Sequence, residues 1–507
     1  LATVAPEKEP TGPFARFFRN PPTFQVAIPG QEFWVNIHAM NPTNLPVELE
    51  SATLRTPEGE QWMIDPATRT GGTLKGNQSV DLRFAVHTGV DAHYTRPYFM
   101  RPNIEQSYYD ILEPKFLNLP VAPYPLSAVV RFSYNGTPFE LSQVVQSVQR
   151  VTGPGTIVEP LIVGPAISVS IAPQAGIVPL NAKSFALTVS IHSNVKGPAK
   201  GTVKLDLPGG WTAKQEEFST AKDGDDKTLN FRVLPEGLTE KPYTITAVAS
   251  YDGHEYKEGY HTVGYAGLRP YNLYRPSTYR TTGVDVKVAP DLNVGYIAGA
   301  GDEMPQSLTN LSINVHFLAT EDLASGDLSK FDAIVLGVRT YAVREDLKTY
   351  NSRILDYVKR GGVVIVQYNT PEYDHNYGPY PYKMGSNPEE VTDEGSKMEI
   401  LDPNNPVFTW PNKITTKDFE NWVEERGSKF LESWDSAYKP LLETHDPGQA
   451  DQKGGLLYAR YGKGVYIYNA YAFYRQMPEG VPGAYRIFAN MVSLAKNPQV
   501  MRPHSTN

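Results

Sequence analysis

Apolar and polar residues alternate along much of the first half of the chain, which is typical of β-strands that bury one face. Every second residue is apolar in 33–37 and again in 185–191. The strand pairs that begin there end at Pro-Glu-Gly (57–59) and Pro-Gly-Gly (208–210). Because Pro presets φ and Gly accepts a positive φ, both tripeptides indicate tight turns.

These strands belong to a sequence repeat. Residues 26–59 and 177–211 share an apolar-Pro step, a polar turn, an alternating strand, an Asn-containing turn and a second strand. Later in each copy, Asn135-Gly136 and Asp252-Gly253 lie between alternating strands, which is a strong hairpin signal. The repeat predicts two tandem immunoglobulin-like β-sandwiches. The predicted division is an N-terminal extension at 1–20, a first sandwich at 21–162 and a second at 163–268.

The first sandwich carries an insertion at 95–120 that is rich in Tyr, Phe and Pro. One interpretation is a loop that packs over the end of the sandwich. The other is an aromatic surface that faces a ligand or a partner.

After about Tyr274 the pattern changes to short, continuously apolar segments that alternate with helical periodicity. The expected strands are 291–302, 313–319, 331–338 and 363–369, and a hairpin is expected at 454–470. The expected helices are 344–362, which ends at Gly361 after Lys359-Arg360, and 481–495. Buried strands that alternate with helices predict a parallel sheet covered by helices on both sides. We therefore expect an α/β domain at 269–500 and a tail at 501–507.

Ligands of open α/β sheets bind at the carboxyl ends of the strands. The residues expected there, or in the loops that follow, are Asp302, Glu303, Arg339, Tyr368, Asn369, Asp374, His375 and Arg475. Each group also has a plainer interpretation. Asp302 and Glu303 suit the start of a helix, Arg339 suits an ion pair, and Asp374 with His375 suits a polar loop.

Composition excludes several classes of protein. The chain of 507 residues has no Cys, so disulfides, thiolate zinc sites, iron–sulfur clusters and a Cys nucleophile are all impossible. The net charge of −8 comes without a basic stripe, which argues against nucleic-acid binding. No apolar run approaches the ~20 residues of a membrane-spanning helix. The chain begins at Leu1 and not at Met, so we expect a removed leader or a longer parent polypeptide.

No catalytic motif accompanies these candidates. The chain has no H-E-x-x-H, no H-x-x-E-H and no G-x-S-x-G, and its ten His residues are scattered. The Gly-Ala-Gly-Asp loop at 299–302 lacks the full dinucleotide-binding spacing. The residues alone therefore do not identify a reaction.

A family resemblance nevertheless covers nearly the whole chain. The segments that carry it include TRPYFMRP, VGPAISVSIAP, LRPYNLYRPSTYR, VDVKVAPDLNVGYIAGAGDEMPQSL, FDAIVLGVRTYAVREDL, LDYVKRGGVVIVQYN, TTKDFENWVEERG, LLETHDPG and GVPGAYRIFANMVSL. Together they resemble the C-terminal region of large, secreted bacterial PIG-L (LmbE-like) N-acetyl-sugar deacetylases. The resemblance implies β-sandwiches similar to those beside carbohydrate-binding modules, followed by a flavodoxin-like domain similar to class I glutamine amidotransferases and ThuA-like proteins.

Two departures from that family limit what the resemblance implies. The His-Pro-Asp-Asp-type zinc motif of the deacetylase domain is absent, so no cofactor is expected here and zinc belongs only to a domain upstream of Leu1. The position that matches the amidotransferase Cys is Tyr368-Asn369-Thr370, which excludes amide hydrolysis by that route.

Three hypotheses follow. The leading one is a non-catalytic, extracytoplasmic accessory region that binds a glycan or mediates assembly, as a homo-oligomer or within a larger surface complex. The second is a sugar-processing enzyme that uses the strand-end residues of the α/β domain. The third is a structural subunit of a cell-surface complex, with the insertion at 95–120 as its interface.

Overall fold

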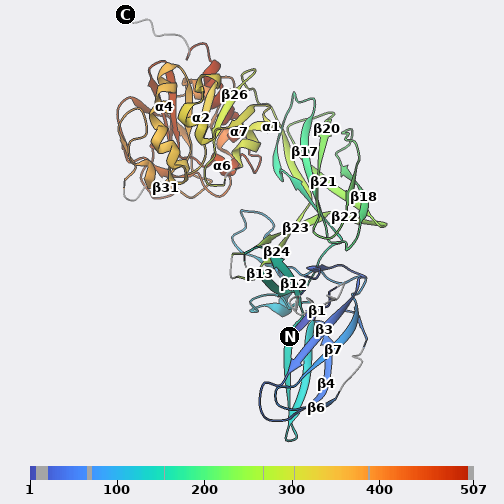
Figure 1. The fold of residues 1–507 in the computed structure, drawn as a ribbon. Coiled ribbons are helices and arrows are strands. Elements are labelled where there is room, and N and C mark those ends of the chain that lie inside the picture. The colour runs from blue at the N-terminus through green and yellow to red at the C-terminus, as the bar shows by residue number, and fades with distance from the viewer. Residues whose placement is uncertain are drawn as a thin grey trace, which may run out of the picture.

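The computed structural model describes residues 1–6, 21–65, 71–153, 155–265, 268–301, 303–385 and 389–500. It shows a β-rich chain of three units, each with its own apolar core (Figure 1). The first β unit is drawn in blue to cyan, the second β unit in green, and the α/β unit in yellow to red. Among the described residues, no helix combines the length and the apolar character that crossing a bilayer requires.

Two main sheets enclose the core of the first β unit. Their strand orders are β13-β12-β1-β3-β7-β5 and β11-β10-β4-β6, and β2 pairs with β14 in a separate sheet. The strands are β1 (Ala2–Val4), β2 (Val26–Ala27), β3 (Glu32–Met40), β4 (Val47–Arg55), β5 (Met63–Ile64), β6 (Gly72–Leu74), β7 (Ser79–His87), β10 (Ser127–Tyr134), β11 (Thr137–Val144), β12 (Gln146–Val151), β13 (Gly155–Pro160) and β14 (Ile162–Val163). Phe33, Val35 and Ile37 are buried, as their alternation predicts.

Strand β1 corrects the expected N-terminal extension. Ala2 lies opposite Ile37 and Val4 opposite Val35, in antiparallel pairing with β3. Both Ala2 and Val4 are buried in the core of the first β unit. The prediction that 1–20 lies outside the sandwich is therefore wrong for residues 2–4, because a strand of three residues is too short to show alternation. Residues 7–20 lie outside the described part of the chain.

The second β unit also consists of two sheets around one core. One sheet has the order β15-β17-β20, and the other has the order β16-β25-β21-β18-β19 with β22 paired to β21. The strands are β15 (Ile167–Ala172), β16 (Ala175–Pro179), β17 (Phe185–Ser193), β18 (Ala199–Asp206), β19 (Glu216–Thr220), β20 (Asp226–Val233), β21 (Pro242–Tyr251), β22 (His254–Tyr256), β23 (Glu258–Val263), β24 (Tyr271–Pro276) and β25 (Thr278–Val284). Strands β23 and β24 form a separate hairpin.

Strand β25 moves the boundary between the second β unit and the α/β unit. It pairs in parallel with β16 and antiparallel with β21, so it completes the sheet of the second β unit. The prediction that the α/β domain begins at 269 is therefore wrong by two strands, since β24 and β25 both belong to the second β unit. The error has a physical cause, because a parallel partner 100 residues away leaves no local signal in the sequence.

Both predicted hairpin turns are confirmed. Asn135-Gly136 connects β10 to β11, and Asp252-Gly253 connects β21 to β22. All four residues have positive φ, between 48° and 78°. This is the backbone of the two-residue turn that matches the twist of antiparallel strands.

The α/β unit is built on one mixed sheet with the order β27-β26-β28-β29-β38-β37-β35. Strands β27 to β38 in this order are parallel, and β37 and β35 continue antiparallel. The strands are β26 (Asn293–Ile297), β27 (Asn314–Phe317), β28 (Ala333–Leu336), β29 (Val363–Val366), β30 (Tyr382–Lys383), β31 (Glu389–Val391), β32 (Glu399–Ile400), β33 (Gly427–Phe430), β34 (Ser433–Trp434), β35 (Tyr438–Pro440), β36 (Leu442–Glu443), β37 (Leu456–Tyr461) and β38 (Gly464–Asn469).

The helices of this unit follow the expected pattern. They are α1 (Met304–Asn310), α2 (Thr320–Ser325), α3 (Thr340–Val343), α4 (Glu345–Arg360), α5 (Pro406–Thr409), α6 (Phe473–Gln476) and α7 (Pro482–Ser493), with 3-10 turns at Leu328–Lys330, Pro371–Tyr373, Thr416–Phe419 and Leu494–Lys496. Both long helices, α4 and α7, pack against β29. Helix α4 ends at Gly361, whose φ is 127°, as predicted.

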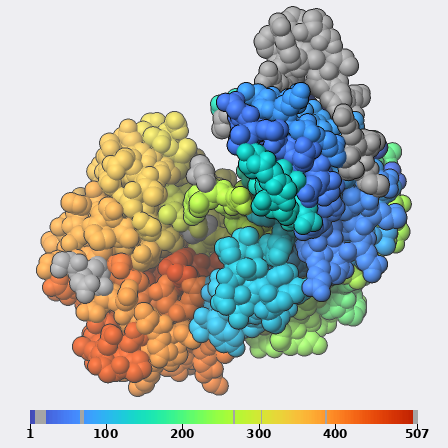
Figure 2. Space-filling view, turned by 90° about the horizontal axis from the view of Figure 1, so that it is seen from below, coloured from blue at the N-terminus to red at the C-terminus, as the bar shows by residue number. Residues whose placement is uncertain are grey.

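The insertion at 95–120 contains a short ribbon of β8 (Phe99–Met100) and β9 (Asp110–Ile111), followed by the 3-10 turn η2 (Pro114–Phe116). Glu105 in this segment accepts a hydrogen bond from the backbone N–H of Glu424 in the α/β unit, at 2.9 Å. Figure 2 shows the same segment, in light blue, against the orange surface of that unit. The insertion therefore joins the first β unit to the α/β unit.

Candidate functional site

The strand-end residues predicted from the sequence divide between buried scaffold and surface. Asp302 lies outside the described residues. Glu303 is exposed at the start of α1, and its side chain makes no capping hydrogen bond there. Arg339 is exposed directly after β28, where it has a left-handed φ of 56° and precedes α3.

Tyr368 and Arg475 come together at the end of β29. The Tyr368 ring stacks on the ring of Tyr474, with centroids 5.7 Å apart. Burial raises the pKa of Tyr368, and Glu425 adds to this effect, although the guanidinium groups of Arg339 and Arg475 oppose it. Tyr368 is therefore a neutral phenol at ordinary pH.

Arg475 is held by two carboxylates. Its Nε donates to Glu425 Oε1 at 2.8 Å, and its Nη1 pairs with Glu424. The Tyr474 hydroxyl donates to the same Glu425 oxygen at 3.0 Å. Burial lowers the pKa of Arg475, but the contacts with Tyr474 and the two glutamates outweigh burial and raise it. The guanidinium of Arg475 is thus fully paired, and the two carboxylates share this one cation.

Asn369 has a structural role. It is fully buried, its Oδ1 accepts from the Tyr341 backbone N–H at 3.0 Å, and its Nδ2 donates to the Gln367 carbonyl at 2.9 Å. These bonds tie the end of β29 to α3. Both polar atoms of the amide are thus bonded to backbone groups, so the side chain is not available to a substrate.

Asp374 and His375 lie in the loop after β29. Asp374 Oδ1 accepts from the Met384 backbone N–H at 2.7 Å, which makes it a loop-stabilising carboxylate. His375 is exposed, with its ring edge-on to Tyr377 at 6.3 Å. These contacts of Asp374 and His375 are with their own loop. Of the predicted set, the structure brings Arg339, Tyr368 and Arg475 together, because the Arg339 N–H donates to the Tyr368 carbonyl at 2.8 Å and both guanidinium groups oppose the burial-driven rise in the pKa of Tyr368.

A cleft of about 860 Å³ lies elsewhere, between the two β units. One wall comes from β12 and β13 of the first β unit, including Gln149 and Glu159. The facing wall is the outer face of the β15-β17-β20 sheet, and the β23–β24 hairpin supplies Tyr260 and Asn272. Volumes of this order hold small ligands.

A row of polar side chains crosses the sheet wall of this cleft. Ser168, His192 and Asp226 are register partners on the three adjacent strands β15, β17 and β20. His192 Nδ1 and Asp226 Oδ1 are 2.8 Å apart. Ser170 and Ser190 form the next row and also line the cleft. A period-two strand places these polar residues on the face opposite the core.

The hairpin wall contributes aromatic and amide groups. The Tyr260 hydroxyl donates to Asn194 Oδ1 at 2.9 Å, and the Tyr260 ring lies edge-on to His192 at 5.9 Å. Thr262 donates to Asn272 Oδ1 at 2.8 Å. Asn272 is only 7% exposed, and its Nδ2 has no hydrogen-bond partner among the described residues. This nitrogen is itself buried, so Asn272 helps to form the cleft wall but offers no open donor to a ligand.

Charge at the opposite wall is modest. Burial raises the pKa of Glu159, while the guanidinium of Arg269 opposes the shift. Arg269 in turn lies over the ring of Tyr124, 5.9 Å from its centroid. Tyr124 and Tyr271 also line the cleft, so aromatic faces, hydroxyls, an amide and a carboxylate surround one volume.

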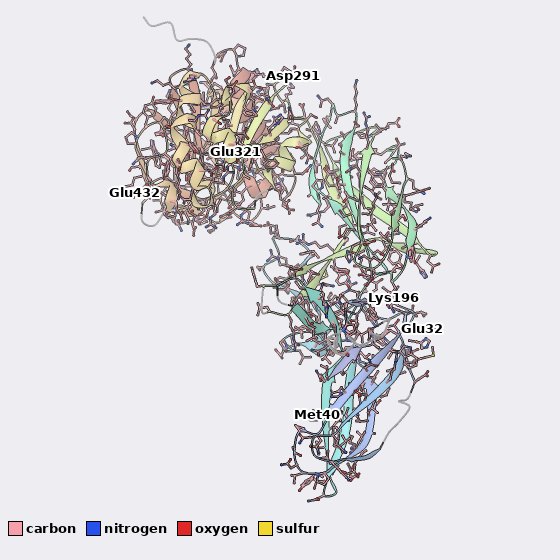
Figure 3. The ribbon with its side chains drawn as sticks, in the orientation of Figure 1. Glu32, Met40, Lys196, Asp291, Glu321 and Glu432 are labelled. Carbon is pink, nitrogen blue, oxygen red and sulfur yellow. The ribbon has the colours of Figure 1, made fainter. Side chains whose placement is uncertain are left out.

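Contacts between the β units hold the cleft walls in place. Arg96 of the first unit pairs with Glu258 of β23 at 2.7 Å, and its guanidinium carbon lies 4.3 Å from the ring centroid of Tyr274 on β24. We call Arg96, Tyr94, Glu258 and Tyr274 the clasp. At the same junction, where Figure 3 labels Lys196, that ammonium lies 4.9 Å from the Phe24 ring centroid.

Sequence reasoning missed the cleft because its walls come from distant segments. One signal was present, since each copy of the repeat contains an Ile-His pair, at His38 and at His192. Each His contacts an Asp on the neighbouring strand. The pattern thus marks a polar outer face in both units, but it does not say which face meets another unit.

Within the described residues, no group of three or more His, Asp or Glu side chains is arranged to hold a metal ion.

No protein-family model and no curated protein matches the chain. Among solved structures, a putative GMP synthase component from Thermoplasma acidophilum matches 41% of this chain and 94% of its own, at 10% identity and a TM-score of 0.29.

A cold-adapted β-galactosidase from Rahnella sp. R3 matches 43% of this chain and 32% of its own, at 16% identity and a TM-score of 0.25. The CBD1 domain of Calx matches 23% of this chain and 96% of its own, at 12% identity and a TM-score of 0.15. At scores this low, the likenesses establish neither a family nor a function for this chain.

Proposed function

We propose that this chain is a non-catalytic, extracytoplasmic accessory region that binds a glycan in the cleft between its two β units. In this proposal the β units are immunoglobulin-like sandwiches, and the α/β unit is a flavodoxin-like domain of the class I amidotransferase type. The parent protein is a secreted deacetylase of the PIG-L type, with its zinc in a domain outside this chain.

The observation that carries the proposal is the polar lining of the cleft. Sugars present many hydroxyl groups, which both donate and accept hydrogen bonds, together with apolar C–H faces that pack on aromatic rings. The row Ser168, His192 and Asp226 offers donors and acceptors at strand spacing. Tyr260, Ser170 and Ser190 line the same volume. This combination suits a neutral polyhydroxylated ligand.

The state of the strand-end cluster supports a non-catalytic role. A nucleophile needs a base within hydrogen-bond reach. Tyr368 belongs to the segment 368–370 that the family resemblance matches to the amidotransferase Cys, and its raised pKa keeps it protonated. Arg475 is occupied by Glu424 and Glu425. The alternative hypothesis of a sugar-processing enzyme would require Arg475 to leave its carboxylate partners or Tyr368 to lose its proton.

Isothermal titration of the full chain with an N-acetylhexosamine tetrasaccharide, and with its N-deacetylated counterpart, tests the binding proposal. We expect His192→Ala and Asp226→Ala each to weaken binding by about 5- to 30-fold, since each residue lines the cleft and its loss removes roughly 1–2 kcal/mol of hydrogen bonding. His38→Ala is the matched control, because His38 contacts Asp81 at 2.7 Å on the corresponding face of the first β unit, away from the cleft. Equal affinities for all three variants, or no binding of either sugar, would overturn the proposal.

A second measurement tests the non-catalytic part. The full chain is incubated with the N-acetylated tetrasaccharide and Zn²⁺, and released acetate is quantified against a protein-free blank. We expect no release above the blank. Release that a chelator abolishes would contradict the assignment of deacetylation to a separate domain.

A further inference from the structure

The insertion presents a concentrated apolar surface. We call residues 99–119 the lobe. Eight of its large apolar side chains are exposed: Met100, Ile104, Tyr108, Tyr109, Ile111, Leu112, Leu117 and Leu119. Tyr108 is 66% exposed, and Leu117 is 55% exposed. Soluble monomers rarely expose so many neighbouring apolar groups, and such patches mark interaction surfaces.

The lobe is held in this shape by its own contacts. The Phe99 ring meets Tyr109 edge-on at 5.2 Å, and Tyr98, at the base of the lobe, meets Phe116 at 6.4 Å. The Tyr98 hydroxyl donates to the Leu119 carbonyl at 2.9 Å, and the Tyr98 carbonyl accepts from the Leu112 N–H at 2.8 Å. The outward apolar side chains are therefore presented by a preformed surface, so binding a partner costs little ordering entropy.

Every charged side chain of the lobe already has a partner. The contacts are Arg101 with the carbonyls of Asn103 and Ile104, Glu105 with the Glu424 N–H, Asp110 with Gln106, and Glu113 with Lys115. Of these described side chains, only Glu113 and Lys115 form an ion pair, whereas Arg101, Glu105 and Asp110 bond to neutral groups, keep their charges and are exposed. Because these three charges are of both signs, a second copy of the lobe can place its Arg101 opposite a carboxylate of the first.

The size of the surface also fits a dimer. The eight side chains are roughly half exposed, so they offer on the order of 100 Å² each, or about 800 Å² in total. A standard protein–protein interface takes about 800 Å² from each partner. Tyr and Met are enriched in interface cores, and Met100, Tyr108 and Tyr109 are among the eight side chains. The exposed charged residues of the lobe suit the polar rim of such an interface.

We propose that the lobe is the surface through which two copies of this chain form a symmetric dimer. A two-fold axis through the lobe brings the same residues of both copies together, so that each apolar side chain is covered by its counterpart or a neighbour. The short ribbon of β8 and β9 has no further strand on either edge among the described residues.

Sedimentation velocity of the full chain, from about 1 to about 100 µM, tests the proposal, because interfaces of this size commonly assemble in that range. We expect a concentration-dependent dimer. Leu112→Glu or Tyr108→Glu should weaken dimerisation by about 30-fold or more, since each buries a charge at the centre of the contact. Phe317→Glu is the matched control, because Phe317 is 63% exposed on β27 of the α/β unit, outside the lobe. Circular dichroism confirms that each variant is folded.

Single cysteines give a second test, because the chain contains none of its own. Leu112→Cys should form a disulfide-linked dimer under mild oxidation at least 10-fold faster than Phe317→Cys. A chain that stays monomeric over the whole concentration range, or a dimer that Leu112→Glu leaves intact, overturns the proposal. So does a monomeric chain that binds phosphatidylcholine vesicles through the lobe, since that result assigns the surface to lipid.

Discussion

Each β unit contains a His–Asp pair on the outer face of a sheet, but the two pairs have different surroundings. In the first unit, His38 on β3 contacts Asp81 on β7 at 2.7 Å. In the second, His192 on β17 contacts Asp226 on β20 at 2.8 Å. Both pairs follow an Ile-His step of the sequence repeat. Only the second pair lines the cleft, because the sheet that holds the first pair faces the cleft with its far strands β12 and β13 and not with β3 and β7.

The difference lies in what surrounds each His–Asp pair. The β23–β24 hairpin leans on the second unit, where the Tyr260 N–H donates to Ser168 Oγ at 3.2 Å. The Arg96 side chain of the first unit reaches over to the same hairpin. A repeat thus supplies a polar sheet face twice, and tertiary packing turns one copy into a candidate binding site. Variants that act on one copy and spare the other test this distinction.

The largest effect is expected from the two cores. Phe84 lies opposite Val35 in the first unit, and Phe231 lies opposite Leu187 in the second, and both Phe side chains are almost fully buried. Phe→Ala at either position leaves a cavity that costs about 3–5 kcal/mol. We expect hydrogen exchange to rise within residues 163–284 for Phe231→Ala, and within the first β unit for Phe84→Ala.

Equal increases in hydrogen exchange across both β units, in both variants, would contradict the view that each unit has an independent core. That result would mean that the two β units unfold as one cooperative body. A conservative Phe→Leu change at each position serves as the control, because it keeps an apolar side chain and leaves a smaller cavity.

Local signals account for the parts of this fold that the sequence predicts. Asn135-Gly136 and Asp252-Gly253 set their turns through the backbone of two residues, and Gly361 ends α4 in the same local way. The predicted boundary of the second unit is misplaced, because β25 is held by β16 across 100 residues. Non-local pairing of this kind leaves no mark on the pattern of either strand.

The candidate site shows the same limit. Asn369 follows a parallel strand, as a ligand-binding residue would, but its amide is used by the backbone of Tyr341 and Gln367. The sequence identifies which residue types stand at a strand end. It does not show which hydrogen bonds they have already made. The cleft could not be predicted for a different reason. Its lining combines residues far apart in the sequence, and only the fold shows that the Nδ2 of Asn272 is buried there without a partner among the described residues.

An intermediate effect is expected from the clasp. Arg96→Ala removes a half-exposed ion pair to Glu258 and a cation–π contact with Tyr274, together worth about 1–2 kcal/mol. We expect glycan affinity to fall by about 5- to 20-fold, because the clasp sets the separation of the cleft walls. Small-angle scattering should report a wider distribution of distances between the β units.

Arg55→Ala is the matched control for the clasp. Arg55 pairs with Glu140 at 3.4 Å on the surface of the first β unit, so its loss removes an exposed ion pair that spans no junction. We expect that variant to bind glycan like the unmodified chain. If Arg96→Ala and Arg55→Ala behave alike, the cleft does not depend on the junction between the units.

The smallest effect is expected at the repeated hairpin turns, and it should be equal in the two units. Gly136 has φ 78° and Gly253 has φ 76°, and a Cβ added at either glycine meets nothing within 4 Å. The cost of Gly→Ala is therefore backbone strain alone, about 1 kcal/mol at each turn. Denaturant unfolding followed by hydrogen exchange measures the cost in each unit separately. Neither variant should change glycan affinity, because both turns lie outside the cleft. Unequal costs would show that the two copies of the repeat already differ in their local turns, and the contrast between the units could then no longer be assigned to packing alone.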